Sequence, residues 1–209
     1  MGTERATTAT DATTTVIHVV DDDASMRTAL TRLLEHAGYA VRAYASAGDF
    51  LVSEPDARPG CMLLDLQLPG PSGLELQQAL RRQHNALPIV FISAHADVPR
   101  TVRAIKGGAS DFLVKPVDSQ QLLAAIESAL AGAASPMQEQ PPAADAVPFN
   151  ERELTVLRGV LAGRLNKQLA HDLGLSERTI KSCRAEVMRK LGARSLAELV
   201  RLATPLLPR

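Results

Sequence analysis

The sequence predicts an α/β domain built on a doubly wound, five-stranded parallel sheet, followed by an all-α domain of four helices. From residue 16 to about 131, short β-rich runs alternate with amphipathic helical stretches, the pattern of a parallel sheet covered by helices on both faces. Residues 132–148 hold four prolines among alanines and polar residues, which favours a linker. From residue 149 onward only helical periodicity remains. The sequence therefore divides into two domains of different class.

Composition is consistent with a folded globular protein. Of 209 residues, 45% are hydrophobic and 22% charged, which is enough for a packed core. No apolar run approaches the ~20 residues of a membrane-spanning helix. Residues 1–15 lack the basic start and apolar core of a signal peptide, so we expect a disordered tail there. Cys61 and Cys183 fall in different domains and form neither a disulfide framework nor a zinc site; a reducing, cytoplasmic setting fits best.

The net charge of zero hides an asymmetry between the two parts. From Phe149 onward, Lys and Arg minus Asp and Glu gives 12 − 6 = +6, and the preceding residues give 11 − 17 = −6. The acidic and basic halves suggest that only the second part meets a polyanion. Uneven surface charge would explain the same numbers equally well.

The elements of the first part follow from their periodicity. Amphipathic helices are predicted at 25–37 and 73–82, and a third helix at 122–130 closes the unit. Right-handed crossovers would place all strands parallel. The predicted strands are residues 16–20, 40–44, 61–65, 88–93 and 111–114.

Chemically useful side chains follow four of these strands. The first strand is followed by three aspartates, residues 21–23, and the third ends at Asp65; the fourth ends at Ser93, and the fifth is followed by Lys115. The carboxyl ends of parallel strands meet at one edge of the sheet, where ligands bind. Clustered carboxylates repel each other and call for a hard cation with oxygen ligands, typically magnesium. The combination predicts a magnesium-dependent aspartyl-phosphate site.

Each residue also has a purely structural explanation. The three aspartates could cap the helix that begins near Ser25, and Asp65 could open a turn before Pro69-Gly70. Ser93 and Lys115 carry little information alone. The order of all four, each at an apolar strand end, favours the site. His18, inside an apolar strand without a second ligand nearby, is expected to be a core or edge histidine.

Residues 16–131 resemble the receiver domain of two-component response regulators, a flavodoxin-like fold, above all in the string LLDLQLPG around Asp65. The resemblance implies that Asp65 accepts the phosphoryl group, that Asp22 binds magnesium directly and Asp21 through water, and that the Gln67 carbonyl adds a ligand. It further implies that Lys115 pairs with the phosphoryl oxygens and that a cis Lys115-Pro116 peptide fixes the direction of the lysine. Ser93 and Phe112 would form the switch. Asp23 and His95 receive no fixed role.

The second part reads as a helix-turn-helix domain. Helices are predicted at 151–162, 166–173, 177–191 and 195–203, with a break at Gly174-Leu175-Ser176. Ser176 is a suitable N-cap for the third of these helices. Within that helix, Ile180, Val187 and Leu191 form the inward stripe, joined by Cys183. The opposite arc, suited to the major groove, carries Arg178, Lys181, Ser182, Ala185 and Arg189.

Residues 149–203 resemble the LuxR-type DNA-binding domain of FixJ-like and NarL-like regulators, through the strings ERELTVLRGVLAG, LNKQLAHDLGLSERTIK and VMRKLGARSLAELV. Asn166, Lys167 and Thr179 are then expected at backbone phosphates, with Arg184 flanking the arc. Relatives commonly have histidine in place of Cys183. The alternative explanation of these charges is a basic helix face that is only solvated. The 3% aromatic content argues against single-strand recognition.

Together these resemblances imply a cytoplasmic, non-enzymatic transcription regulator with the second domain at 149–209. A sensor histidine kinase would phosphorylate Asp65, and the resulting homodimer would bind double-stranded promoter DNA and act on RNA polymerase. One rival is a phosphatase with an aspartyl-phosphate intermediate, but such enzymes usually have a second acid where this chain has Gln67. Another is a constitutive DNA-binding protein with a vestigial receiver, against which the intact set of site residues argues.

Overall fold

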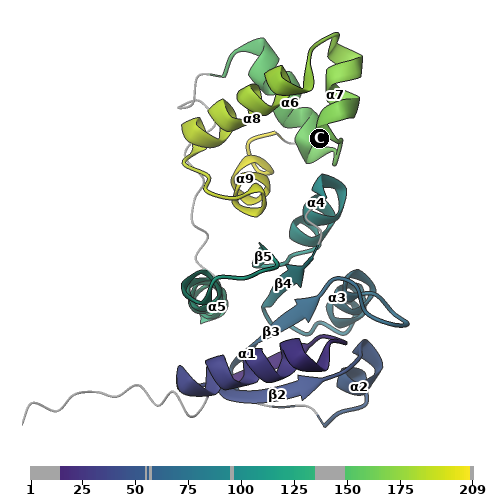
Figure 1. Ribbon diagram of the computed structural model, residues 1–209, viewed down its shortest axis with the longest axis vertical. Helices are drawn as coiled ribbons and strands as arrows, with labels where there is room; N and C mark the ends of the chain where they lie inside the picture. The colour runs from purple at the N-terminus through teal and green to yellow at the C-terminus, as the bar shows by residue number, and fades with distance from the viewer. Residues whose placement is uncertain (1–14, 55, 57, 95–96, 135–148, 208–209) are drawn as a thin grey trace, which may run out of the picture.

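A five-stranded, fully parallel sheet forms the centre of the first domain in the computed structural model, which describes residues 15–54, 56, 58–94, 97–134 and 149–207. The strand order β2-β1-β3-β4-β5 (Figure 1) reverses direction between β1 and β3, and in such sheets ligands bind at this switch point. The predicted strands agree with the observed ones to within a residue. These are β1 (Val16–Val20), β2 (Ala40–Tyr44), β3 (Gly60–Asp65), β4 (Ile89–Ser93) and β5 (Asp111–Val114).

Helices cover both faces of the sheet and divide its core in two. On one face α1 and α5 bury residues such as Leu34 and Ile126 against Ile17 and Val19 of β1. On the other face α2, α3 and α4 pack over Phe91 and the alternate side chains of the same strands. The helices of this domain are α1 (Ala24–His36), α2 (Ala47–Leu51), α3 (Gly73–Arg82), α4 (Val98–Lys106) and α5 (Ser119–Ala134).

Two helices were not located from the sequence, and one is longer than predicted. The five residues of α2 are too few to show a helical period. In α4, Pro99 interrupts the apolar pattern, although Asp97 is an N-cap and Val98, Val102 and Ile105 are buried at helical spacing. Helix α5 continues to Ala134, so the first residues of the predicted linker 132–148 are helical. Residues 135–148 of the predicted linker, and residues 1–14 of the predicted tail 1–15, lie outside the described residues.

The second domain contains α6 (Glu151–Leu161), α7 (Asn166–Leu173), α8 (Glu177–Leu191) and α9 (Leu196–Ala203). Between α7 and α8, Gly174 adopts a left-handed conformation with φ 62°, and the Ser176 side chain accepts the Thr179 N–H at 3.1 Å. A partly buried ion pair, with Lys190 Nζ 2.7 Å from Glu153 Oε2, joins α8 to α6. Helices α7 and α8 pack on each other across this turn as a helix-turn-helix.

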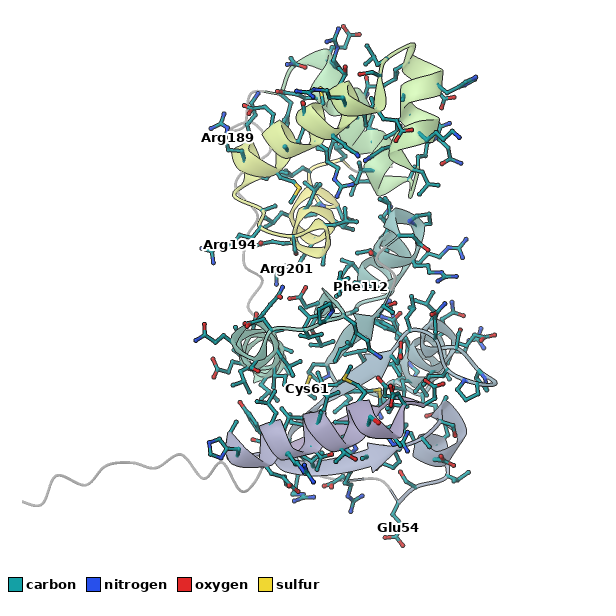
Figure 2. The ribbon with its side chains drawn as sticks, in the orientation of Figure 1. Glu54, Cys61, Phe112, Arg189, Arg194 and Arg201 are labelled. Carbon is teal, nitrogen blue, oxygen red and sulfur yellow. The ribbon has the colours of Figure 1, made fainter. Side chains whose placement is uncertain are left out.

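The two domains contact each other through α4 and β5 on one side and α9 on the other (Figure 1). Figure 2 shows Phe112 of β5 and Arg201 of α9 on either side of this boundary. The apolar core on the α4 face of the sheet is continuous with the core of the second domain. Helix α9 therefore covers the α4–β5 surface of the first domain.

Candidate functional site

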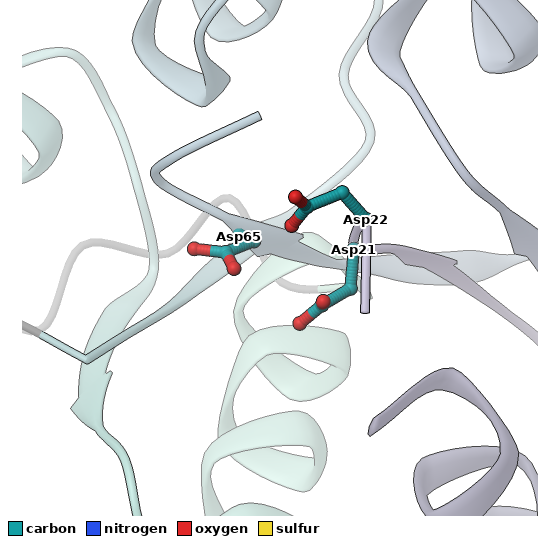
Figure 3. Close-up of side chains that lie close together, drawn as sticks. All are labelled: Asp21, Asp22 and Asp65. Carbon is teal, nitrogen blue, oxygen red and sulfur yellow. The ribbon is translucent and has the colours of Figure 1, made fainter. Parts of the chain in front are cut away.

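Three carboxylates lie together at the carboxyl edge of the sheet (Figure 3). Because β1 and β3 pair in parallel with Val20 opposite Leu64, the residues that come next, Asp21 and Asp65, are neighbours. One oxygen of each, and one of Asp22, all lie within 4.8 Å of one another. Asp21 is 2% exposed and Asp65 8%, whereas Asp22 is open to solvent. Such a cluster suits a hard cation with oxygen ligands, and the chain has the acidic cluster typical of a receiver's Mg²⁺ site.

Lys115 is the cation of this site in the structure. Its Nζ donates to Asp21 Oδ2 at 2.7 Å and to Asp65 Oδ2 at 2.8 Å. Partial burial alone would lower the pKa of Lys115, but hydrogen bonds to the two carboxylates outweigh it and raise the pKa above its ordinary value. The Lys115–Pro116 peptide is cis, as the receiver resemblance implied. The lysine therefore remains charged between two nearly buried acids.

Backbone groups orient the carboxylates further. Asp21 Oδ1 accepts the Asp23 N–H at 2.9 Å, and Asp65 Oδ1 accepts the Gln67 N–H at 3.1 Å. Arg27, which the sequence did not single out, donates from its guanidinium to the Asp21 carbonyl at 2.7 Å. No pattern in the sequence pointed to this residue, because the contact depends on how α1 leaves the sheet. These bonds hold the acids in place before any ligand arrives.

Capping explains only one of the three consecutive aspartates. Asp23 is the N-cap of α1, and its side chain accepts the N–H groups of Ser25 and Met26. Asp21 and Asp22 instead belong to the acidic cluster. The structural alternative considered for the whole run is therefore correct for Asp23 alone.

The proposed switch residues occupy the ends of the neighbouring strands. Ser93 is fully buried at the end of β4, and its carbonyl accepts the Lys115 N–H at 2.8 Å. Phe112 is 5% exposed, and its ring stacks beside Phe91 with centroids 6.2 Å apart. Gln67 is exposed just beyond β3. Ser93 thus lies at the acidic edge beside Lys115, while Phe112 lies at the boundary between the two domains.

His18 belongs to the core of the first domain and is not a metal ligand among the described residues. His18 is 5% exposed, with Nδ1 3.4 Å from the Tyr44 hydroxyl and its ring edge-on to Phe50. Burial lowers its pKa. It is a core histidine, as expected. His95 lies outside the described residues.

The outer face of α8 presents the expected polar arc. The inward stripe of Ile180, Val187 and Leu191 is buried, and Cys183 packs at the edge of the core. Lys167 on α7 is exposed, and Thr179 is half-buried at the start of α8. The exposed residues of the arc are Arg178, Lys181, Ser182, Ala185 and Arg189.

Two of the predicted DNA contacts lie toward the first domain. Arg184 and Asn166 are half-buried and line a pocket whose other wall includes Phe112 and Thr101. The sequence could not place them there, because the pocket exists only where α9 has docked on α4 and β5. The helical wheel had put Arg184 at the border of the outward arc.

Comparison with known proteins identifies the class that this fold and site define. Residues 17–127 match the response regulator receiver domain family, and residues 147–203 match the family of bacterial regulatory proteins of the luxR type. The chain belongs to the response regulators that join these two domains, which are transcription regulators and not enzymes. It is a FixJ-like regulator of a two-component system.

Relatives of similar length support this assignment. Nodulation protein W of Bradyrhizobium diazoefficiens is 43% identical over 93% of this chain and 88% of its own length. Transcriptional regulatory protein FixJ of the same organism is 42% identical over 90% and 93%. The crystal structure of full-length FixJ from B. japonicum shares 40% identity, covers 93% of this chain and 98% of its own, and has a TM-score of 0.56.

The similarity in three dimensions comes mainly from the receiver. The isolated FixJ receiver structure covers only 56% of this chain yet has a TM-score of 0.53, nearly that of full-length FixJ. The response regulator StyR, covering 91%, has a TM-score of 0.55. The second domains add little to the superposition, which indicates that the two domains are placed differently in those crystals.

Among the described helices, none is both long and apolar enough to span a bilayer.

Proposed function

We propose that this protein is switched by phosphorylation of Asp65 by a sensor histidine kinase, and that the phosphorylated form dimerises on promoter DNA. The observation that carries this proposal is the position of Lys115 Nζ, 2.8 Å from Asp65 Oδ2 and 2.7 Å from Asp21 Oδ2. A nucleophilic carboxylate beside a fixed cation can attack phosphorus in line, because phosphoryl transfer depends mainly on positioning and charge neutralisation. The proposed domain limits are 16–131 and 149–209, with residues 132–148 between them.

Magnesium is the cofactor that the carboxylates fit. Asp22 would bind it directly, Asp21 through water, and Asp65 and the Gln67 carbonyl would complete the protein's share. When bound, it would neutralise the charge that a phosphoryl group brings to three carboxylates. Lys115 would hold the phosphoryl oxygens from the opposite side, and the Ser93 hydroxyl would donate to them.

Domain docking suggests how the signal reaches the second domain. We expect the receiver to dimerise through the face formed by α4, β5 and α5, and α9 covers the α4 and β5 part of that face. A phosphorylated dimer formed there requires the second domain to leave that surface. Movement of Ser93 and Phe112 toward the site would shift this equilibrium, provided that the two arrangements differ in their affinity for the phosphoryl group. The different domain placement in related full-length crystals is consistent with a weak interdomain contact.

The second domain would then read double-stranded DNA through α8, with lysine and arginine at base edges or phosphates. Two copies would occupy adjacent half-sites and act on RNA polymerase in the cytoplasm. The proposed DNA contacts are Asn166, Lys167, Arg178, Thr179, Lys181, Ser182, Arg184, Ala185 and Arg189.

The test is sedimentation equilibrium with magnesium, with and without beryllofluoride as the phosphoryl mimic. We expect a monomer that becomes a dimer only with the mimic, and no such change in Asp65→Asn. The matched control is Asp23→Asn, which keeps the N-cap and lies outside the acidic cluster, so it should dimerise normally. Dimerisation of Asp65→Asn, or an unchanged mass for the wild type, would contradict the proposal and favour a vestigial receiver.

A further inference from the structure

A pocket of about 460 Å³ lies between the two domains. Its receiver wall is formed by α4 and β5, and its other wall by the first turns of α7 and α9 together with α8. Much of the lining is apolar: Val98, Phe112, Val114 and Leu196. The pocket is therefore large enough, and apolar enough on its sides, for a small organic molecule.

Arg184 supplies a cation without a counter-ion. Its side chain lines the pocket, and within the described part of the chain it has no ion pair or hydrogen bond. Burial lowers the pKa of its guanidinium, although an arginine remains charged. Removing a cation from water is costly, so a half-buried guanidinium without a partner gains from a counter-ion. An anion in the pocket would offset that cost and could accept two N–H bonds in parallel.

The acid on the opposite wall is already engaged. One oxygen of Asp97 accepts the Arg100 N–H at 2.8 Å as the N-cap of α4, and the other lies 3.2 Å from the Arg100 guanidinium. The pocket therefore keeps an uncompensated positive charge.

Asn166 provides a second unsatisfied group. Its Oδ1 is buried and has no hydrogen-bond partner among the described residues, and the residue lines the same pocket. Because the oxygen and nitrogen of an amide can exchange places, Asn166 can offer either a donor or an acceptor to a ligand. Leu165, which precedes α7, has no side-chain oxygen to cap the N–H groups of the first turn. Arg184 and Asn166 thus both line this cavity, and neither side chain has a partner for its charge or its buried oxygen among the described residues.

We propose that this interdomain pocket binds a small organic carboxylate with an apolar body. The carboxylate would pair with Arg184 and hydrogen-bond to Asn166, while the apolar body would pack against Phe112, Val98 and Leu196. Arg184 and Asn166 belong to the second domain, and the apolar lining comes from both domains. A ligand held by both domains stabilises the docked arrangement and disfavours its opening.

Direct binding to the full-length protein tests the site without DNA, magnesium or a phosphoryl mimic, so its failure is independent of the proposed function. The probe is 4-hydroxybenzoate, followed by isothermal titration calorimetry, with neutral 4-hydroxybenzyl alcohol as the isosteric control. The variant is Arg184→Gln. Its matched control is Arg189→Gln, an arginine on the same helix that is exposed and paired with Glu186 instead.

We expect saturable, one-to-one binding of 4-hydroxybenzoate to the wild type and to Arg189→Gln, and at least tenfold weaker binding to Arg184→Gln. The neutral alcohol should also bind at least tenfold more weakly. Should Arg184→Gln fail to fold, Val114→Phe, which fills the pocket from the half-exposed end of β5, should abolish binding by itself. Absence of binding at millimolar probe, equal affinity for Arg184→Gln, or equal affinity for the neutral alcohol would each overturn the proposal.

Discussion

Replacement of Lys115 by methionine isolates the electrostatic role of this residue, because the side chain keeps a similar length and loses its charge. The ammonium lies within 2.8 Å of two carboxylates whose side chains are 3% and 10% exposed. Breaking a buried ion pair by removing one partner costs ~3–5 kcal/mol. The site opens to solvent at Asp22, so we expect a loss near the lower end, ~3 kcal/mol. For a chain of this size that corresponds to a fall in Tm of roughly 10 °C.

Urea unfolding followed by circular dichroism measures the effect, and magnesium provides an internal check. The divalent ion can replace the missing ammonium among the carboxylates, so the difference in free energy of unfolding between wild type and Lys115→Met should become smaller as magnesium is added. Lys106→Met, a change at an exposed lysine of α4, should stay within ~0.5 kcal/mol of the wild type.

The pH dependence follows from the direction of the pKa shift. The folded-state pKa of Lys115 is raised, so its stabilisation is complete below the unfolded value of ~10.4 and is lost as pH rises through the folded value. The gap between wild type and Lys115→Met should therefore be constant near neutral pH and close at strongly alkaline pH. Equal stability of the two proteins at pH 7 without magnesium would refute the assigned role of Lys115.

Three further predictions concern the core around the site. A Cβ on Gly73 would clash with the Asp65 carbonyl oxygen, so Gly73→Ala should lower stability by ~1–3 kcal/mol and weaken magnesium binding in a titration. Gly132→Ala, with open space around the Cβ, is its control. Burial lowers the pKa of His18, so as pH falls below ~6.5 the unfolded chain takes up a proton before the folded protein does. Stability should therefore drop by up to ~1.4 kcal/mol at pH 5.5. Urea unfolding of His18→Gln should lack this pH-dependent loss of stability. Burial raises the pKa of the Cys61 thiol to about 12, so mass spectrometry should find iodoacetamide on Cys183 and not on Cys61 in the native protein at pH 8.

Much of the fold could be predicted because its elements carry strong local signals. The apolar runs that became β1 and β3 are buried on both faces, as in a parallel sheet, and α3 has both a capping box at Ser72 and a regular apolar period. Helix α4 was missed because Pro99 and its charged residues obscure a short period. The ends of α5 were misjudged because its small alanines and glycine carry little periodic signal.

The site was predictable in its members but not in its contacts. Asp21, Asp65 and Lys115 each come at a strand end, and parallel pairing obliges strand ends to meet. That Lys115 bonds to Asp21, 94 residues away, and that Asp23 caps α1 while its two neighbours do not, depends on how the chain leaves each strand. The same holds for Arg27, which reaches the Asp21 carbonyl from the second turn of α1.

The sequence by itself determined the two domain types, the order of the strands' functional side chains and the inward stripe of α8, because each depends on periodicity over a few neighbouring residues. Tertiary structure alone decided that α9 lies on α4 and β5, that Phe112 lies beneath this contact, and that Arg184 and Asn166 line a pocket instead of an open face. These features arise where surfaces from distant segments meet. Their burial depends on shape and area across the domain boundary, which no local pattern encodes.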